Sequence, residues 1–558
     1  MSSCFKSIIK YKVNILHIIL IVLCGIISST FLFSTTRCLA GGDGYFHIDR
    51  MLAIAANIEK GNFPARMSTT FWNGYGNATL IMYPQTFIYI PAMIYRLTDN
   101  YCLAFNAFLI LINVLTGILM YVCQALIFKK YSDDKVYNIA FIASILWIFA
   151  PYRLTDLYVR VAVGELLGAM FFPFFVLGTY YLLADDCKKW PVFVIASTCV
   201  FRSHILSSFF CIVIFIILFI FNIRNMSFKR FGVMILSFFV TLIINLNELI
   251  PMMEYMNSYE MVMPFKTVLN DEALKLETFI NQTVENYSIQ FIFLILLILS
   301  VTYAVLLLIK RASKWYIYMQ FTFMAVFFTF ITSQLFNWEN PESIAVLKRI
   351  LDSLQFPWRL SMVASFFIAI ISSHMIYSII QKIFNERYRV LGYVGIFILI
   401  ICIYTPYTHY NYSYGSFRRF GNTDYMHSKS VLWEALNYYD GNLIYEKDKI
   451  DITNLKKDLN ALSFDYELKE ISEGKVVLPL FNFPGYVCRD ENNDINEITE
   501  NFNAQIEVTL TKSKGAVNVR FEGKKLWNIL DIVSFSSLMV LILYTICAYY
   551  IGLKIKKE

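Results

Sequence analysis

The sequence predicts an all-α polytopic membrane protein, with about twelve spans and additional juxtamembrane helices, that carries a C-terminal β-rich domain outside the membrane. Three observations support this fold class. Of the 558 residues, 57% are hydrophobic and only 16% are charged, whereas about a quarter of the residues of a soluble protein are charged. Long apolar runs recur along the chain. Pro406–Leu526 differs in composition, because 33 of its 121 residues are charged, against 56 of the remaining 437.

This composition excludes several broad classes of protein. A soluble enzyme and a disordered chain both need far more charge and less apolar surface. The eleven cysteines mostly stand singly inside apolar runs, so the sequence shows neither a disulfide framework nor a metal-type spacing. The net charge of +7 is small for this length and gives no reason to expect a nucleic acid partner.

The first apolar run covers about Val13–Phe33, and three lysines precede it, which predicts a cytoplasmic N-terminus. The run is longer than a signal-peptide core, and Cys38-Leu39-Ala40 is a poor cleavage site, so we expect a retained anchor. Eleven further runs have about the length that crosses the hydrocarbon core. They begin near Tyr101, Val136, Gly164, Trp190, Ile205, Phe231, Ser288, Trp315, Trp358, Val390 and Trp527.

Basic clusters in the loops predict the orientation, since cytoplasmic loops are enriched in Lys and Arg. Twelve spans place every cluster in the cytoplasm, provided that the apolar stretch Leu80–Tyr95 does not cross. Pro84 and Pro91 disfavour a straight span there, so we expect a juxtamembrane or re-entrant helix on the outer side. The clusters are Lys129-Lys130, Lys188-Lys189, Arg224 with Lys229-Arg230, Lys310-Arg311, Lys382 with Arg387, and Lys554-Ile555-Lys556-Lys557.

Three regions follow from this topology: a membrane domain with external loops (1–405), an extracytoplasmic β-sandwich-like domain (406–526), and a final span with a basic cytoplasmic tail (527–558). Alternating apolar residues predict strands at Ala504–Leu510 and Val517–Phe521, joined by a hairpin turn at Lys512–Gly515. The other elements expected in this domain are a strand at Val476–Phe481, a turn at Asn482–Gly485 and a helix at Leu432–Tyr439.

Nearly every unusual polar residue falls in the segments predicted to lie outside, which are Ser34–Ala78, Pro151–Val163, Met252–Tyr287, Phe336–Phe356, Pro406–Leu526 and the hairpin Arg202–His204. In the first of these, Asp43 stands among glycines, just before a helical pattern. It fits an N-cap or, because the glycines let the backbone approach a ligand, a functional acid. His47 and Arg50 lie one turn apart on the same helix face, with Asp49 between them.

A second polar cluster contains Arg153, Asp156, Arg160 and Glu165 within thirteen residues. At helical spacing, Asp156 can pair with either arginine. The cluster fits a structural salt-bridge network at the headgroups. It equally fits a phosphate site, since guanidinium groups bind phosphate through two parallel hydrogen bonds.

A third cluster, Gln355-Phe356-Pro357-Trp358-Arg359, begins a predicted span on the outer side. Trp358 is a typical interfacial anchor. An arginine at membrane depth on the outer side needs an anion, either an acid or a lipid phosphate, unless it snorkels to the headgroups. Arg202, which stands close to His204, also lies on the predicted outer side and needs an anion in the same way. Glu248 and Glu254 flank Pro251 at another outer end and are weaker candidates.

The order of these motifs resembles that of the bacterial YfhO-like membrane proteins, a branch of the GT-C superfamily of polytopic glycosyltransferases. The resemblance covers almost the whole chain, and the Arg153–Glu165 and Gln355–Arg359 motifs are its most specific parts. The motifs are Gly42-Asp43-Gly44-Tyr45-Phe46-His47-Ile48-Asp49-Arg50, Gly74-Tyr75-Gly76, Tyr83-Pro84, Ala150-Pro151-Tyr152-Arg153, Asp156-Leu157-Tyr158-Val159-Arg160, Gly164-Glu165, Ser203-His204, Gln355-Phe356-Pro357-Trp358-Arg359 and Pro484-Gly485-Tyr486.

The resemblance implies a GT-C fold and transfer of a sugar from a polyprenyl-phosphate carrier to an acceptor on the extracytoplasmic side, usually with inversion. The family's essential acid would be Asp43. The chain has no clear Asp-x-Asp pair here, since Asp49 is six residues on. A divalent cation therefore stays open as a cofactor, and so does the choice of Asp49, Asp156 or Glu165 as a second acid.

In this chemistry, Asp43 takes the proton of the acceptor hydroxyl, with His47 as the alternative base or as an orienting group. Arg359, Arg153, Arg160 and Arg202 are the candidates that stabilise the departing phosphate. The supporting candidates are Asp49, Arg50, Asp156, Glu165, His204, Glu254 and Gln355.

The expected partners are a polyprenyl-phosphate-linked sugar, a cell-surface glycan acceptor and membrane lipids, at the plasma membrane. A non-catalytic alternative is a translocase of lipid-linked glycans or a glycan-binding scaffold. Few mid-span charges are present, which argues against a polar passage for translocation. A sugar-polymer ligase or polymerase differs mainly in the size of its donor.

Overall fold

The computed structural model describes residues 2–132, 135–281, 283–312, 315–344, 348, 351, 354–415, 424–431, 440–469 and 472–555. The chain forms two compact units, each built from segments that are far apart in the sequence. Unit 1 consists of Met1–Gly44, Phe105–Thr241 and Phe265–Gly415, and unit 2 of Tyr45–Ala104, Leu242–Pro264 and Ser416–Glu558.

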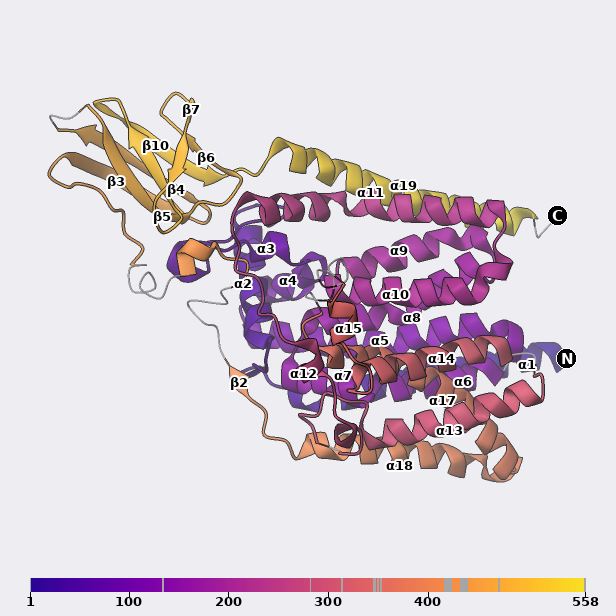
Figure 1. Ribbon diagram of the computed structural model, residues 1–558. Helices are drawn as coiled ribbons and strands as arrows, with labels where there is room; N and C mark the ends of the chain where they lie inside the picture. The colour runs from indigo at the N-terminus through magenta and orange to yellow at the C-terminus, as the bar shows by residue number, and fades with distance from the viewer. Residues whose placement is uncertain are drawn as a thin grey trace. The chain divides into compact units, whose positions relative to one another are not determined.

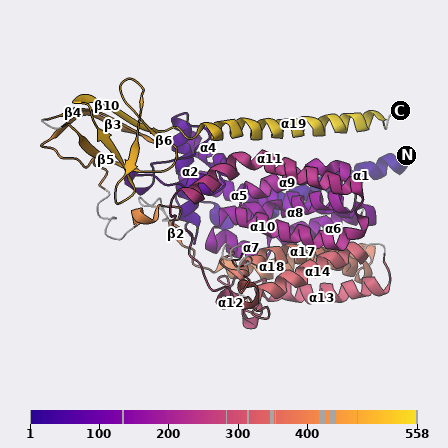
Figure 2. The same ribbon diagram turned by 45° about the horizontal axis from the view of Figure 1, so that its top comes forward.

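Unit 1 is a bundle of long helices that run side by side (Figures 1 and 2). Its centre is formed by α6 (Val136–Ile148), α8 (Val163–Leu183) and α17 (Ser361–Ile383), which are almost entirely buried. These helices are apolar on every side, which suits a central position. Around them lie α1 (Ser2–Ile27), α9 (Trp190–Phe201), α10 (Ile205–Asn222), α13 (Gln290–Ile309), α14 (Trp315–Thr332), α18 (Arg389–Thr408) and most of α5 (Tyr101–Ser132) and of the first half of α11 (Phe228–Ser258).

Short elements of unit 1 connect the long helices and carry most of its polar residues. They include α7 (Pro151–Thr155), which continues into a π-helical turn at Asp156–Arg160, α12 (Leu269–Glu272) and α15 (Glu339–Glu342). The strands β1 (Cys38–Leu39) and β2 (Tyr414–Gly415) pair in antiparallel fashion and join the two ends of the unit's sequence.

Unit 2 contains the short helices α2 (Gly44–Glu59, from Tyr45 on), α3 (Thr79–Met82) and α4 (Tyr89–Thr98), and the long terminal helix α19 (Lys525–Ile555). Its β-strands form two antiparallel sheets, ordered β3-β4-β10-β6-β7 and β5-β9-β8. The strands are β3 (Ile450–Asp458), β4 (Ala461–Leu468), β5 (Gly474–Phe481), β6 (Tyr486–Arg489), β7 (Ile495–Asn496), β8 (Ile498–Glu500), β9 (Gln505–Leu510) and β10 (Lys514–Phe521).

Among the described residues, nine helices are long and apolar enough to cross a membrane, and ten if the bent pair Val136–Ile148 and Pro151–Arg160 counts as one span. The protein is therefore a multi-pass membrane protein. All twelve predicted runs fall on helices, but α9, of 12 residues, is short for a span. The total of twelve spans stays a prediction.

The stretch Leu80–Tyr95 does not form one continuous helix, as its two prolines predict. It is divided between α3, of four residues, a 3₁₀ turn at Thr86–Ile88 and the start of α4, of ten residues. None of these helices reaches the roughly 20 residues that cross a bilayer.

In the β region, the predicted strand at Val476–Phe481 is confirmed as β5, and the two alternating segments are confirmed as β9 and β10. The predicted hairpin at Lys512–Gly515 is wrong, because β9 pairs with β5 and β8 whereas β10 pairs with β4 and β6. Alternation identifies strands but not their partners, and here the chain passes from one sheet to the other. The helix predicted at Leu432–Tyr439 lies outside the described residues.

Candidate functional site

The candidate site of unit 1 is built on the segment that follows α6. The chain bends by 44° between Val136–Ile148 and Pro151–Arg160. Pro151 begins α7, where a missing N–H costs no hydrogen bond. The segment then widens into a π-helical turn and ends at Val161, whose φ is +55°. A β-branched residue in this region is strained, and both features occur most often at functional sites.

Arg160, the last residue of the π-helical turn, is the centre of a group of acids. Its Nη1 donates to Asp156 Oδ1 at 2.7 Å and to Glu165 Oε2 at 2.5 Å, and its Nη2 lies 3.3 Å from Asp43 Oδ2. Nη1 also donates to the Tyr152 hydroxyl at 3.2 Å, which in turn donates to Glu165 Oε1 at 2.9 Å. We call these five residues the Arg160 cluster.

The acids of the Arg160 cluster differ sharply in exposure. The Asp156 side chain is fully buried, that of Glu165 is 2% exposed and that of Asp43 is 45% exposed. Asp156 Oδ2 is buried without a hydrogen-bond partner in the described part of the chain. Three carboxylates thus surround one guanidinium, and only Asp43 can be reached by a reactant.

The glycine-rich loop before α2 is fixed to the π-helical turn through its backbone. Gly42 N–H donates to the Val159 carbonyl at 3.2 Å and Asp43 N–H to the Arg160 carbonyl at 2.7 Å. Gly41 has φ +48°, and a Cβ there would lie 2.6 Å from the Val159 oxygen. Only glycine fits such a position. The loop therefore holds the Asp43 carboxylate beside Arg160.

Aromatic rings cover the other side of Arg160. Its guanidinium lies over the Trp358 ring at 4.9 Å, a cation–π contact. Trp358 stacks on Tyr287 at 4.4 Å and on Phe356 at 4.6 Å, and its indole N–H donates to Glu272 at 3.4 Å. Burial raises the pKa of Tyr287, and the charges of Arg160, Asp156 and Asp43 act on its phenol. Tyr287 therefore belongs to the site.

Arg359 lies at the edge of the cluster, close enough for its charge to act on Asp156 and Glu165. Its only hydrogen bond within the described residues is a long one, 3.4 Å, to the Leu354 carbonyl, and its buried Nε has no partner there. The guanidinium also lies over the Phe356 ring at 5.2 Å. Arg359 is half-buried and makes no ion pair within the described part of the chain.

His204 and Gln355 also belong to unit 1. The charge of His204 acts on Glu165, and a Cβ on Gly168, one turn after Glu165, would lie 2.4 Å from Ser207 Oγ. The close packing of α8 on α10 thus brings His204 to the acids. Gln355, at φ +60°, donates to the Phe265 carbonyl and shapes the turn before Trp358. Arg202 is half-buried in the turn before α10.

Arg153 has a different environment from the other arginines. It is fully buried and donates to the Ile148 carbonyl, to Thr116 Oγ1, both at 3.1 Å, and to Asn113 Oδ1. The predicted pair of Arg153 with Asp156 is wrong, whereas the pair of Asp156 with Arg160 is confirmed. All partners of Arg153 are neutral groups of α5 and α6, so its geometry favours a structural role.

The other predicted residues of the first loop lie in unit 2. His47, Asp49 and Arg50 are all buried. Arg50 donates to His47 Nδ1 at 3.2 Å and to the carbonyls of Tyr83 and Pro84, and burial lowers its pKa to about 10. Because Arg50 is the donor, the Nδ1 atom of His47 accepts and is unprotonated. Within unit 2, the His47 ring is therefore held by Arg50.

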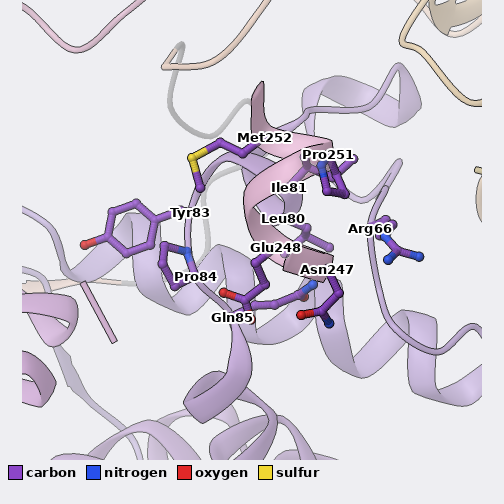
Figure 3. Close-up of a pocket in the computed structure, with 10 residues that line it drawn as sticks. All are labelled: Arg66, Leu80, Ile81, Tyr83, Pro84, Gln85, Asn247, Glu248, Pro251 and Met252. Atoms are coloured by element: carbon purple, nitrogen blue, oxygen red, sulfur yellow. The ribbon is translucent and has the colours of Figure 1, made fainter. Parts of the chain in front are cut away.

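Unit 2 also contains a small pocket, which Figure 3 shows in close-up. Gln85, Glu248 and Asn247 gather on one side of it, and Ile81, Pro251 and Met252 on the other. Glu248 accepts from Thr86 at 2.9 Å. Another wall residue, Arg66, binds both oxygens of Asp531 at 2.9 Å and so ties α19 to this unit.

Glu254 is paired within unit 2 and does not reach the pocket wall. It accepts from the Trp527 indole at 2.9 Å and from Lys524 at 3.0 Å. These contacts fix the start of α19.

No family model matches the chain, and no curated protein is detectably similar to it. In the part of the chain that the structure describes, no three His, Cys, Asp or Glu side chains are placed to hold a metal ion. Three members of the site, Tyr152, Tyr287 and Glu272, were not among the residues predicted from the sequence. Tyr152 stands inside the quoted Ala150–Arg153 motif, which was a usable signal, whereas Tyr287 and Glu272 carry none.

Proposed function

We propose that the protein is a membrane glycosyltransferase of the GT-C type, which moves a sugar from a polyprenyl-phosphate donor to a cell-envelope glycan on the outer face of the plasma membrane. The observation that supports this best is the contrast within the site of unit 1. An accessible carboxylate, Asp43, is held by the buried Arg160, while a second guanidinium, Arg359, stands nearby without an ion pair among the described residues.

Asp43 is the proposed general base. Its exposed fraction of 45% leaves room for an acceptor hydroxyl, whereas Asp156 and Glu165 are buried. The acceptor oxygen attacks C1 of the sugar and forms the new glycosidic bond as the bond from C1 to the phosphate oxygen breaks. The hydroxyl proton passes to the Asp43 carboxylate, and the electron pair leaves with the polyprenyl phosphate.

Arg359 is the proposed ligand of the departing phosphate. Its guanidinium donors are largely uncommitted, and hydrogen bonds between charged partners are stronger than neutral ones. His204 and Arg202 are further candidates from the turn before α10. Arg160 is engaged by its own carboxylates, so we assign it the positioning of Asp43 rather than contact with the donor.

We also propose the number of membrane spans and the side of the membrane on which the site lies. Twelve spans would place both termini in the cytoplasm and the site, with the β-sandwich-like region, outside. A cytoplasm-active reporter fused after Glu558 and an export-active reporter inserted within residues 410–420 should both be active. Activity of only one of them would contradict this orientation.

The direct test uses cells that naturally carry the protein. They are deprived of it and complemented with wild type, Asp43→Asn or Asp271→Asn, and the glycan composition of the envelope is measured. Asp271 is an exposed acid of α12 and serves as a matched control. We expect wild type and Asp271→Asn to restore the missing sugar and Asp43→Asn to restore none, at equal protein levels in the membrane.

Full restoration by Asp43→Asn would remove Asp43 as the base and favour the non-catalytic alternative, a translocase or glycan-binding scaffold. That alternative needs the fold and the charged residues on the outer side but no proton acceptor. Unchanged envelope glycans in the deprived cells would contradict both functions.

A further inference from the structure

Helix α4 carries an apolar side that the described part of the chain leaves exposed. Ile90, Met93 and Leu97 are all exposed, Leu97 to 82%. They follow one another at intervals of three and four residues, so they lie on one side of the helix. Pro91 and Ala92, which lie away from that side, are buried. A helix that faces water exposes polar residues, whereas α4 exposes large apolar ones.

Phe63 adds to this apolar surface at the start of α4. Its side chain is 80% exposed, and its ring lies against that of Tyr89 at 5.5 Å. Tyr89 precedes Met93 by one helical turn, so the two residues are neighbours on the helix surface. Single exposed apolar side chains are common, but a group of large ones marks a contact surface. We call Phe63, Ile90, Met93 and Leu97 the α4 face.

The start of α4 lies beside α19 and the second half of α11, which belong to the same unit. Ala65 N–H donates to the Tyr89 hydroxyl at 2.7 Å. The next residue, Arg66, binds both oxygens of Asp531 on α19 at 2.9 Å. The charges of Asp531 and of Glu248, on α11, also act on the Tyr89 phenol. The first turn of α4 is therefore close to two helices that are candidate membrane spans.

These contacts indicate the depth of α4 in the membrane. Asp531 follows Lys525, the first residue of α19, by roughly 9 Å of helix. The ten residues of α4 extend only roughly 15 Å, so its end cannot reach the opposite side of a hydrocarbon core about 30 Å thick. The span α5 begins at Tyr101, directly after α4 ends at Thr98. Helix α4 thus lies at the membrane boundary where α19 and α5 both begin.

Lipid is the occupant that this position favours. Ile532 and Phe535 are exposed apolar residues of α19 close to Asp531, and the described part of the chain covers little of this span. A span with so much exposed apolar surface faces acyl chains. The α4 face begins at the same depth, so the same acyl chains reach it. Its large apolar side chains, with no charge among them, are what hydrocarbon accommodates.

We propose that α4 is an in-plane membrane anchor, with the α4 face buried among the acyl chains of the leaflet in which α19 begins. A helix of this kind lies parallel to the membrane surface, with its apolar side about 5–10 Å into the boundary between headgroups and acyl chains. In the topology proposed above, this is the outer leaflet. The anchor sets the depth of unit 2 in the membrane and does not depend on sugar transfer.

The test uses the full-length protein in its native membrane, with the photoreactive amino acid benzoylphenylalanine at one position at a time. After irradiation, mass spectrometry of peptides detects bound phospholipid and crosslinks within the chain, and electrophoresis detects a bound second protein. Phe63, Met93 and Leu97 are the test positions. Ile532, which is 68% exposed on α19, is the positive control, and Phe502, which is 79% exposed in the turn between β8 and β9, is the matched control outside the spans.

We expect phospholipid adducts at all three test positions, in yields comparable with that at Ile532, and none at Phe502. The change at Phe63 is the mildest, because benzoylphenylalanine only extends a ring that is already exposed there. Phe63 therefore decides the outcome if either substitution within α4 prevents folding.

A crosslink from Leu97 or Phe63 to a second protein, or to another part of this chain, would overturn the proposal, because the α4 face would then be a protein contact. So would the absence of lipid adducts at the test positions while Ile532 reacts, which would mean that the face lies in water. Equal adduct yields at Phe502 would also contradict it, since lipid capture would then not be specific to the α4 face.

Discussion

The carboxylate of Asp43 lies 3.3 Å from Nη2 of Arg160, and the backbone N–H of the same aspartate donates to the Arg160 carbonyl at 2.7 Å. One arginine therefore fixes both the main chain and the side chain of the accessible acid. Its other guanidinium nitrogen is bound by two buried carboxylates. Asp43 is thus the exposed end of a network whose remaining members are inside the protein.

We predict that Arg160→Gln unfolds the site whereas Asp43→Asn does not. Removing Arg160 leaves Asp156 and Glu165 buried without their guanidinium, which costs about 3–5 kcal/mol. Asp43 is nearly half exposed, and an exposed ion pair contributes about 1 kcal/mol or less. Thermal unfolding in detergent measures both variants. An Arg160→Gln protein as stable as wild type would contradict the structural role of the network.

The glycine loop allows a matched comparison between neighbouring residues. Gly41→Ala should destabilise the loop by about 1–3 kcal/mol, because φ is +48° and the new Cβ would lie 2.6 Å from the Val159 oxygen. Gly42→Ala should be nearly neutral, since the nearest atom to its Cβ is at 3.6 Å. Activity per folded molecule should fall in Gly41→Ala only. Equal losses in both variants would mean that the loop does not position Asp43.

Arg359→Gln should weaken use of the donor with little loss of fold. A hydrogen bond to a charged group contributes about 1.5–3 kcal/mol, so we expect the KM for the polyprenyl-phosphate donor to rise roughly 10- to 100-fold. The fold should persist because Arg359 has one weak internal hydrogen bond. Arg311→Gln, an exposed arginine between α13 and α14, is the control. An unfolded Arg359→Gln protein, with normal turnover per folded molecule, would favour a structural role instead.

Sequence patterns predicted the local features of this molecule well. The apolar runs, the broken stretch at Leu80–Tyr95 and the Asp156–Arg160 pair all depend on neighbours along the chain, and all are present. Spacing alone did not distinguish Arg153 from Arg160, because the π-helical turn between them changes which face of the helix each one occupies.

Features that depend on distant segments were not predictable in this way. Tyr287 and Glu272 contact Trp358 although they precede it by about 70 to 90 residues, and no local pattern marks them. The pairing of β10 with β4 rather than with β9 is equally a long-range choice. The predicted topology placed Asp43 and Arg160, which are 117 residues apart, on the same outer side, but the sequence did not predict that they pair.

Tyr287→Phe tests whether the phenol takes part in the site. The ring stacking on Trp358 at 4.4 Å should persist, so the unfolding midpoint should change little. The hydroxyl makes no hydrogen bond within the described residues, yet the charges of Arg160, Asp156 and Asp43 act on it. We therefore expect lower sugar transfer at an unchanged midpoint. Tyr303→Phe, a tyrosine of α13 paired with Ser378, is the control, and equal activity of all three proteins would remove Tyr287 from the site.

Glu522 should make the β region sensitive to acid. Hydrogen bonds from Arg489, at 2.9 and 3.0 Å, and then from Arg520 lower its pKa to about 2. A carboxyl with a depressed pKa stabilises the fold above its unfolded pKa, about 4.3, and this contribution is lost as the pH falls from there to about 2. Glu522→Gln should therefore increase hydrogen exchange in β6 and β10 relative to wild type at pH 6, and the difference should shrink at pH 3. Comparing the proteins at one pH cancels the intrinsic exchange rate.

The control is Glu497→Gln, at an exposed acid before β8, which should show no difference from wild type at either pH. A Glu522→Gln effect that stays constant from pH 6 to pH 3 would mean that the carboxylate charge is not its cause.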